Sequence, residues 1–337
     1  MPTEDGPEVT SGGAAASRRV NARLVAQELL GRFGVLIMLV ALVVVFSALS
    51  PHFLSQGNIT NVLIQSSTNA VIAAGMTFVI LSANIDLSVG SVLAMSSVLG
   101  TSFIADGGPI PIGIGIMLLG GVVAGGINGF TVSYLGFPAF IVTLATMWLF
   151  RGSAYVFTNG QAVTGLPRDF RILASGEVAG IPYIVLLMVG VYAVCYFVLS
   201  RTTFGRQVYA VGDNKEAARL SGVNVKRVTA AVFVICGLLA ALGGVVLSSR
   251  LFSGQPIAGI TFELSAIAAV VIGGTSLSGG KGGILGTLVG AIFIATLING
   301  LVILNVTSFW QQLIMGLVVL GAVGIDQYRK RLASGRV

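Results

Sequence analysis

The sequence predicts an all-α integral membrane protein, and three features of its composition indicate this. Of its 337 residues, 55% are hydrophobic, only 9% are charged and 46 are glycine. A soluble globular domain has about 25% charged residues, so this chain has too few to cover a surface in water. Transmembrane helices tolerate glycine, which lets their backbones pack closely. We therefore expect a single helical domain surrounded largely by lipid.

Apolar stretches recur along the chain and predict about ten transmembrane helices. A bilayer core of about 30 Å needs about 20 helical residues. The expected spans are residues 34–50, 60–82, 86–104, 110–134, 138–158, 181–200, 228–249, 262–275, 283–304 and 307–325. The stretch 262–275 is too short for a simple span. We expect it to form a broken or re-entrant eighth element that leads into a glycine-rich turn.

Three regions follow from this pattern. Residues 1–33 begin with small polar residues that cannot form a core, so we expect a disordered, basic N-terminal tail. The apolar run that starts at residue 34 is longer than a typical signal-peptide core, and no cleavage site is obvious after it, so it is expected to be an uncleaved first span. Residues 34–326 then form the transmembrane domain, and residues 327–337 form a basic C-terminal tail.

The positive charges predict the orientation of the chain. The net charge is +7, and most of the 19 basic residues lie in 1–33, in 201–227, near Lys281 and after residue 325. Cytoplasmic loops of membrane proteins are enriched in Lys and Arg, so we expect both termini in the cytoplasm. No basic stripe lies on a folded polar surface, so nucleic acid is not an expected partner.

The sequence offers no pattern for catalysis, for a metal or for ATP. There is one histidine, and both cysteines lie in apolar runs, so we expect buried thiols and no metal site. The glycine-rich stretch Gly273–Gly283 fails the phosphate-loop pattern G-x-x-x-x-G-K-[ST]. Thr275 stands where the first glycine is needed, and Gly282 where Ser or Thr is needed. We therefore expect a protein that is not an enzyme and has no ATP site of its own.

Ten spans with both termini on one side divide into two sets of five. An odd repeat unit has to be inverted in the membrane, which predicts a 5+5 inverted pseudo-repeat. Ile127-Asn128-Gly129, near the end of the fourth span, is similar to Ile298-Asn299-Gly300, near the end of the ninth. Chance similarity in so biased a composition is the alternative.

The longest polar stretch between spans, 201–227, predicts a short docked helix. Asp213 and Glu216 have the spacing of a capping box, and Gly222 suits the left-handed position just after a helix. The helix between them has about two turns and is marginal alone in water, so it needs to dock against something. An ordinary basic cytoplasmic loop is the alternative.

Several motifs resemble those of binding-protein-dependent ABC permeases, and of the ribose/xylose-type sugar permeases in particular. Glu216–Gly222 matches the E-A-A-x-x-x-G core of the coupling loop in these proteins. The I-x-L-P element that follows in the general motif is absent here. The resemblance covers residues 34–331, and its other matching segments are Asn84–Gly90, Gly136–Leu144, Thr203–Arg206, Ala210–Asn214 and Gly273–Gly280.

This resemblance implies a permease subunit of an ABC importer in the bacterial cytoplasmic (inner) membrane. The subunit would translocate a monosaccharide delivered by an extracytoplasmic sugar-binding protein. A second permease copy, identical or a close paralogue, would complete the pathway in the lipid. ATP and Mg²⁺ would bind to a separate ATPase subunit, so this chain needs no cofactor. An ion-coupled secondary transporter is the alternative. The resemblance implies that these residues contact the ATPase: Asp213, Asn214, Lys215, Glu216, Ala217, Ala218, Arg219 and Gly222.

Polar residues within the apolar stretches have two alternative roles. Asp86 is expected to cap the third span by accepting N–H bonds from Ser88 or Val89, and otherwise to lie in the sugar path. Glu263 suits the N-terminus of the eighth helix, with contact to an external partner as the alternative. A last group is expected to form hydrogen bonds between helices or to contact the sugar: Asn69, Asn84, Asn128, Thr143 and Asn299.

Overall fold

The computed structural model describes residues 34–333, and nearly all of its regular structure is helical. The expected N-terminal tail lies outside the described residues. The helices are Gly34–Leu49, α2 (Gln56–Leu81), α3 (Val89–Ala105), α4 (Ile110–Ser133), α5 (Ala139–Thr158), α6 (Ile172–Ser175), α7 (Tyr183–Arg201), α8 (Thr203–Asp213), α9 (Lys215–Leu220), α10 (Val225–Leu251), α11 (Phe262–Ile272), α12 (Ile284–Ile303) and α13 (Ser308–Ala333). A 3₁₀ turn η1 (Arg168–Arg171) and two paired strands, β1 (Glu177–Val178) and β2 (Ile181–Pro182), complete the described part.

An apolar helix occupies each of the ten expected stretches within the described residues. Six of them are long and apolar enough to cross a membrane on their own: α2, α4, α5, α7, α10 and α12. Four are shorter: Gly34–Leu49, α3, α11 and the apolar part of α13, Ser308–Gly324. The helix α13 continues to Ala333, so the segment that we expected to be a C-terminal tail begins as helix.

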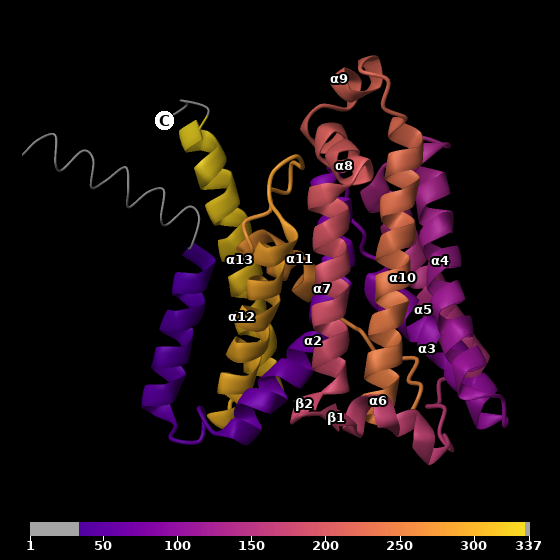
Figure 1. Cartoon of the computed structure of the whole chain (residues 1–337), viewed down its shortest axis with the longest axis vertical. Helices are drawn as coiled ribbons and strands as arrows, with labels where there is room; N and C mark the ends of the chain where they lie inside the picture. The colour runs from indigo at the N-terminus through magenta and orange to yellow at the C-terminus, as the bar shows by residue number, and fades with distance from the viewer. Residues whose placement is uncertain (1–33, 334–337) are drawn as a thin grey trace, which may run out of the picture.

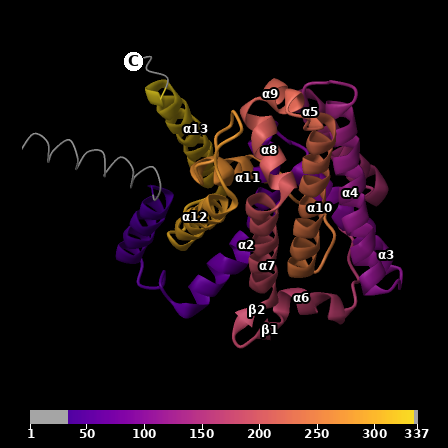
Figure 2. The same cartoon turned by 45° about the horizontal axis from the view of Figure 1, so that its top comes forward.

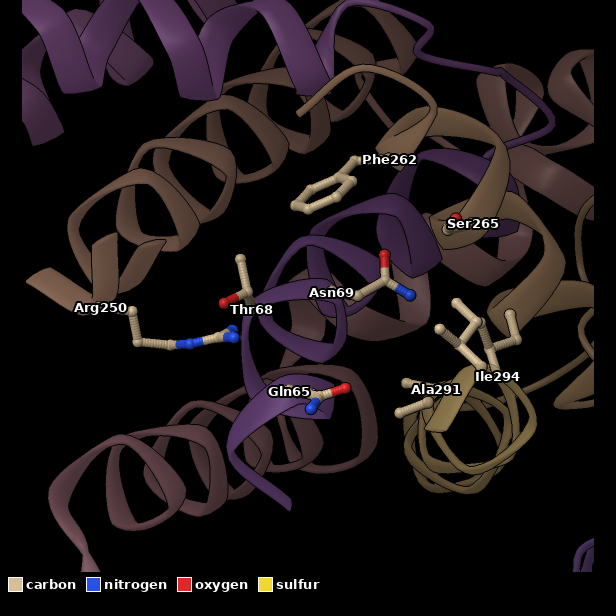
Figure 3. A pocket seen from close by; sticks show the side chains of 10 residues that line it. Gln65, Thr68, Asn69, Arg250, Phe262, Ser265, Ala291 and Ile294 are labelled. Atoms are coloured by element: carbon tan, nitrogen blue, oxygen red, sulfur yellow. The ribbon is translucent and has the colours of Figure 1, made fainter. Parts of the chain in front are cut away.

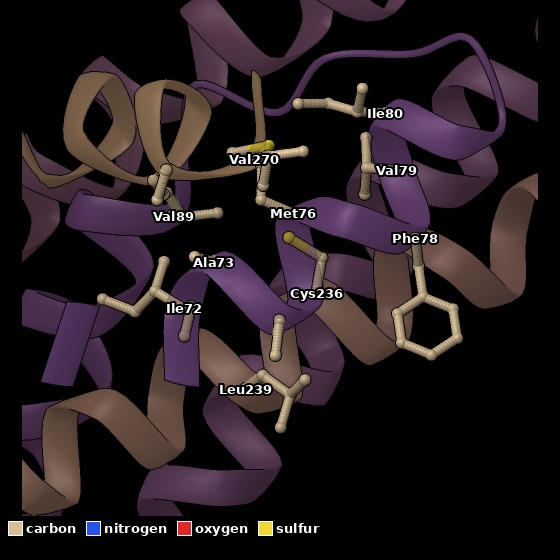
Figure 4. Close-up of a cluster of buried hydrophobic side chains, with 14 of the residues drawn as sticks. Ile72, Ala73, Met76, Phe78, Val79, Ile80, Val89, Cys236, Leu239 and Val270 are labelled. Carbon is tan, nitrogen blue, oxygen red and sulfur yellow. The ribbon is translucent and has the colours of Figure 1, made fainter. Parts of the chain in front are cut away.

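The helix α2 lies at the centre of the bundle. Most of its residues after Val62 are buried, and it packs against α10, α12, α11 and α7. Figure 4 shows this core, in which side chains of α2, such as Ile72 and Met76, meet Val89 of α3, Val270 of α11 and Cys236 of α10. Both cysteines of the chain are buried, as we expected.

Glycine brings α4 and α10 into close contact. A Cβ atom at Gly125 of α4 would lie only 2.9 Å from the Cα atom of Val234. A Cβ atom at Gly237 of α10 would lie 2.9 Å from the amide nitrogen of Gly125. Real side chains do not fit at these distances, so the two backbones touch. The glycine content predicted this kind of packing, and it fixes α10 against α4.

Two non-helical segments, each of which precedes a helix, meet inside the bundle. A buried non-helical segment, 82–88, precedes α3, and the loop 252–261 precedes the short α11. Gly90 and Glu263 lie at this junction, where a Cβ atom at Gly90 would be 2.7 Å from the Glu263 carboxylate. The expected short eighth element is therefore confirmed as an 11-residue helix.

The two ends of the bundle differ. Figure 1 shows α8 and α9 at one end, where α13 also ends, and η1, α6 and the strands at the opposite end. The glycine-rich turn 273–283 lies at the α9 end, because Gly280 donates a backbone hydrogen bond to Leu81 at the end of α2 (3.0 Å).

Candidate coupling surface and transport pathway

The helix α9 projects from the end of the bundle and packs mainly on α8 and α10 (Figures 1 and 2). Its N-cap is Asn214, whose Oδ1 accepts hydrogen bonds from the amides of Glu216 (3.0 Å) and Ala217 (2.9 Å). The predicted capping box that starts at Asp213 is therefore wrong. Asp213 is still helical as the last residue of α8, and only Asn214 has the extended backbone that a cap needs (φ −154°, ψ 105°).

The other capping-box residue, Glu216, faces forward along α9. Its carboxylate accepts hydrogen bonds from Nε of Arg219, at 3.0 Å, and from Nη2 of the same residue. These bonds hold the pKa of the exposed Glu216 carboxyl below its usual value. The pair therefore stays ionised at neutral pH and presents both charges to solvent.

The end of α9 has the geometry that the sequence predicted. Gly222 has φ +84°, which glycine adopts without steric cost. Ala218 is buried below it and accepts a hydrogen bond from the amide of Val223 (3.0 Å). Leu220 is 74% exposed and has no neighbour to cover it within the described chain. The helix thus presents an apolar tip between charged residues.

The base of this projection is fixed to the bundle core. A Cβ atom at Gly212 of α8 would lie 2.7 Å from the Gly280 amide nitrogen, so only glycine fits there. The Tyr209 hydroxyl donates a hydrogen bond to the Gly282 carbonyl (3.0 Å). The end of α2, α8 and the turn 273–283 therefore meet at one point beneath α9.

A buried polar network surrounds Asp86. Its Oδ1 accepts hydrogen bonds from the amide (2.8 Å) and the hydroxyl (2.6 Å) of Ser88. The expected hydrogen bond from Ser88 is confirmed, but the expected cap is wrong, because α3 begins at Val89 and its N-cap is Ser88. Asn128 of α4 donates to the Ser88 hydroxyl (2.8 Å) and accepts from Thr146 of α5 (2.8 Å). The network therefore joins the segment before α3 to two helices.

The other expected polar residues form similar structural bonds. The Thr143 hydroxyl donates to the carbonyl of Ala139 in its own helix (2.8 Å) and approaches that of Ile85 (3.3 Å). The Asn84 side chain donates to the carbonyl and the hydroxyl of Ser82, two residues before it. Asn299 exchanges two hydrogen bonds of 3.0 Å with Asn58. Asn84 and Asp86 thus lie in the segment 82–88, and Asn128 and Thr143 lie next to it. Asn299 lies in another part of the bundle.

Glu263 lies in the first turn of α11, as we expected. It lines a cavity of about 230 Å³ together with Trp148, Arg151 and Tyr155 of α5. Arg151 donates from Nη1 to the carbonyls of Pro256 (2.7 Å) and Ala258 (2.5 Å), which holds the loop before α11.

Asn69 lies apart from these residues, in a cavity of about 120 Å³ between α2, α10, α11 and α12 (Figure 3). Its polar lining is Gln65, Thr68, Asn69, Arg250 and Ser265. Of this set, only Asn69 was expected from the sequence. Thr68 precedes Asn69 directly, and Gln65 lies one turn before it on the same helix. A polar stripe on the second span was therefore the signal that could have found them.

A bundle of long apolar helices with buried polar junctions and a projecting helix at one end is typical of a multi-pass membrane protein. The chain belongs to the family described as branched-chain amino acid transport system / permease component, whose model matches residues 58–323.

Curated relatives match the chain over most of their lengths. A ribose import permease of Haemophilus influenzae is 46% identical over 296 residues, which cover 87% of this chain and 92% of the relative. A ribose import permease of Bacillus subtilis is also 46% identical, over 88% of this chain and 92% of the relative. A xylose transport system permease of Escherichia coli is 36% identical over 96% of each chain. No solved structure matches the chain.

Proposed function

We propose that this chain is the membrane-spanning permease subunit of an ABC importer for a monosaccharide similar to ribose or xylose. The observation that carries the proposal is the similarity to ribose and xylose permeases along nearly the whole of their lengths. The chain would supply a selective passage and mechanical coupling, and a separate ATPase subunit would bind ATP and Mg²⁺. An extracytoplasmic binding protein would deliver the sugar.

The proposed architecture is ten spans in two inverted sets of five. Packing pairs support it when α2, α3, α4 and α5 are matched with α10, α11, α12 and α13. The helix α4 packs on α10 as α12 packs on α2, and α3 packs on α5 as α11 packs on α13. The same matching relates the α3–α4 contact to the α11–α12 contact, and the α3–α10 contact to the α2–α11 contact. Repeated packing of this kind is expected of an internal duplication.

The proposed ATPase contact is the exposed surface of the segment from Asp213 to Gly222. It is the natural docking element because α9 is short, projects from the bundle and carries the exposed Leu220. Each permease has one docking helix, and the transporter has a pair of ATPase subunits to contact. A second permease copy is therefore part of the proposal. Both termini and α9 would face the cytoplasm, and the end with η1 and the strands would face the binding protein.

Reconstitution of the complete transporter tests this function. The permease is purified together with its ATPase subunit and its sugar-binding protein and is placed in proteoliposomes. Uptake of D-ribose or D-xylose should require ATP and loaded binding protein and should not respond to ion gradients. Uptake driven by a proton or sodium gradient without ATP would contradict the proposal.

A further inference from the structure

Two arginines in the bundle differ in how their charge is balanced. Arg151 donates to two backbone carbonyls and lines a cavity together with the Glu263 carboxylate. Arg250, in the last turn of α10, is partly buried and has neither a hydrogen bond nor an ion pair among the described residues. A cation that is withdrawn from water without an acceptor is costly, above all in a membrane protein. Arg250 therefore needs a partner that the described part of the chain does not supply.

The guanidinium of Arg250 lines a cavity in which other polar groups also lack partners. It extends toward Thr68 between α2, α10, α11 and α12 (Figure 3). Thr68 is only 2% exposed, and neither its Oγ1 nor Oδ1 of Asn69 has a hydrogen-bond partner among the described residues. Buried polar atoms are nearly always paired in native proteins, because an unpaired group loses its bonds to water without replacement. Three such neighbours around one cavity therefore indicate that a ligand binds there.

The polar groups around this cavity can all donate hydrogen bonds. Arg250 can only donate, and the hydroxyls of Thr68 and Ser265 both carry a proton. The side chains of Gln65 and Asn69 each have an NH₂ group, and a half-turn of the Asn69 amide places that group where Oδ1 now lies. No carboxylate lines the cavity. A set of donors around one uncompensated positive charge is a site for an anion.

The remaining walls restrict this anion to a small one with a single charge. One negative charge neutralises Arg250, whereas a divalent anion would leave an uncompensated charge in an apolar space. The only acidic residue of α11, Glu263, lines the separate cavity beside Arg151 and does not occupy this one. The cavity has a volume of about 120 Å³, and its other lining residues are Phe262, Ala291, Ile294, Ala295 and Ile298.

We propose that this cavity binds a small monovalent inorganic anion such as chloride, which Arg250, Thr68 and Asn69 hold between α10 and α2. Ser265 brings α11 to the same ion, so the anion ties three helices together and is a structural ligand separate from the transported sugar. A hollow of about 420 Å³ between α11 and α13 adjoins the cavity, because Phe262 and Ser265 line both, and it gives the ion a way in. The alternative occupant is water alone.

Thermal unfolding of the purified full-length protein in detergent tests this proposal. The unfolding temperature is measured in increasing sodium chloride, with sodium gluconate added to keep the ionic strength constant. An anion that binds only the native state stabilises it, so the unfolding temperature should rise by several degrees and then saturate. Gluconate is larger than the cavity can hold and should not replace chloride. Water alone predicts equal unfolding temperatures in the two salts, and that result would overturn the proposal.

Two substitutions assign the effect to this cavity. Arg250→Met should abolish the rise with chloride and, in gluconate, should unfold at the same or a higher temperature, because an unpartnered charge has been removed. Thr68→Val should keep the rise but need about tenfold more chloride, the equivalent of one lost hydrogen bond to a charged group.

Arg171→Met is the matched control for general salt effects. Arg171 is exposed in the η1 turn and lines neither of the two spaces, so its replacement should leave the chloride response intact. A chloride response that Arg250→Met leaves unchanged would overturn the proposed site.

Bromide locates the anion directly and depends on no variant and on no ATP-driven uptake. Crystals of the full-length protein grown in sodium bromide should show an anomalous-scattering peak within hydrogen-bond distance of the Arg250 guanidinium and the Thr68 hydroxyl. Bromide peaks elsewhere on the protein, with none in this cavity, would contradict the proposal.

Discussion

Single buried polar residues join segments that are distant in the sequence. Asp86 receives two hydrogen bonds from Ser88, and Ser88 in turn receives one from Asn128. Asn299 instead pairs with Asn58. Asn128 and Asn299 each occupy the middle of an Ile-Asn-Gly tripeptide, but their hydrogen-bond partners differ. Their observed bonds are the interhelical ones, so a contact with sugar remains a separate proposal for each.

The substitution Asp86→Ala should destabilise the protein more than it changes sugar preference. It leaves the buried amide and hydroxyl of Ser88 without their acceptor, which costs about 1–3 kcal/mol for an unsatisfied buried group. The melting temperature and yield in detergent should fall, while the ratio of ribose to xylose uptake stays constant. Asp106→Ala is the control, because Asp106 is exposed at the end of α3. A stable variant with altered selectivity would instead place Asp86 in the sugar path.

The cap of α9 gives a second test at the residue scale. Asn214→Ala removes an acceptor for two amides, and the loss of such a cap costs about 0.5–2 kcal/mol. The ATPase subunit should therefore bind this variant several-fold more weakly in a co-purification titration. Asp213→Ala removes a charge but no cap, so its effect should be smaller. Equal losses for the two variants would show that the cap does not order the docking surface.

At the scale of elements, α8 and α9 form a rigid projection and not a free loop. Gly212 lies against the backbone of Leu81 and Gly280, and Tyr209 bonds the carbonyl of Gly282. Gly222 ends α9 with a positive φ that returns the chain to α10. The alternative of an ordinary basic loop predicts none of these contacts, although binding of the ATPase remains a proposal.

The substitution Gly222→Val should uncouple transport from ATP hydrolysis without affecting insertion. A β-branched residue at φ +84° carries a strain of about 1–3 kcal/mol, which distorts the end of α9. Membrane levels should be normal, while uptake and the stimulation of ATPase activity by loaded binding protein should fall sharply.

Gly190→Val is the control for that substitution. A Cβ atom at Gly190 of α7 would meet nothing within 4 Å, and the φ of Gly190 is not positive. It should retain assembly, ATPase stimulation and uptake. Full activity of Gly222→Val would show that the segment 213–222 is an ordinary loop without a role in coupling.

At the scale of the whole molecule, contacts between loops and helices show which loops lie at the same end of the bundle. The turn 273–283 touches α8 and the end of α2, so Lys281 lies at the α9 end. The segment with η1 lies at the opposite end. Because basic residues concentrate at the α9 end, this end is the proposed cytoplasmic face.

Cysteine accessibility in intact cells tests that orientation. Lys281→Cys should resist an impermeant thiol reagent added outside and should react once the membrane is permeabilised. Asp169→Cys lies in the exposed η1 turn at the other end and should react from outside. Rapid external labelling at 281 would reverse the proposed topology.

The sequence by itself determined the class of protein, the positions of the apolar helices and the shortness of the eighth helix. Hydrophobicity and helix length are local properties, so the expected span 283–304 differs from α12 by one residue at each end. It also predicted the positive φ of Gly222, because glycine adopts the left-handed conformation just after a helix without steric cost.

Only the tertiary structure decided which polar side chains meet. Asn58 and Asn299 are 241 residues apart, and no local pattern relates their helix faces. Asn214 replaced Asp213 as the cap because α8 continued through Asp213. The cavity at Thr68 needs residues from four helices, whose register is set by packing. Hydrogen bonds act over about 3 Å, so their partners are fixed only once the helices are in place.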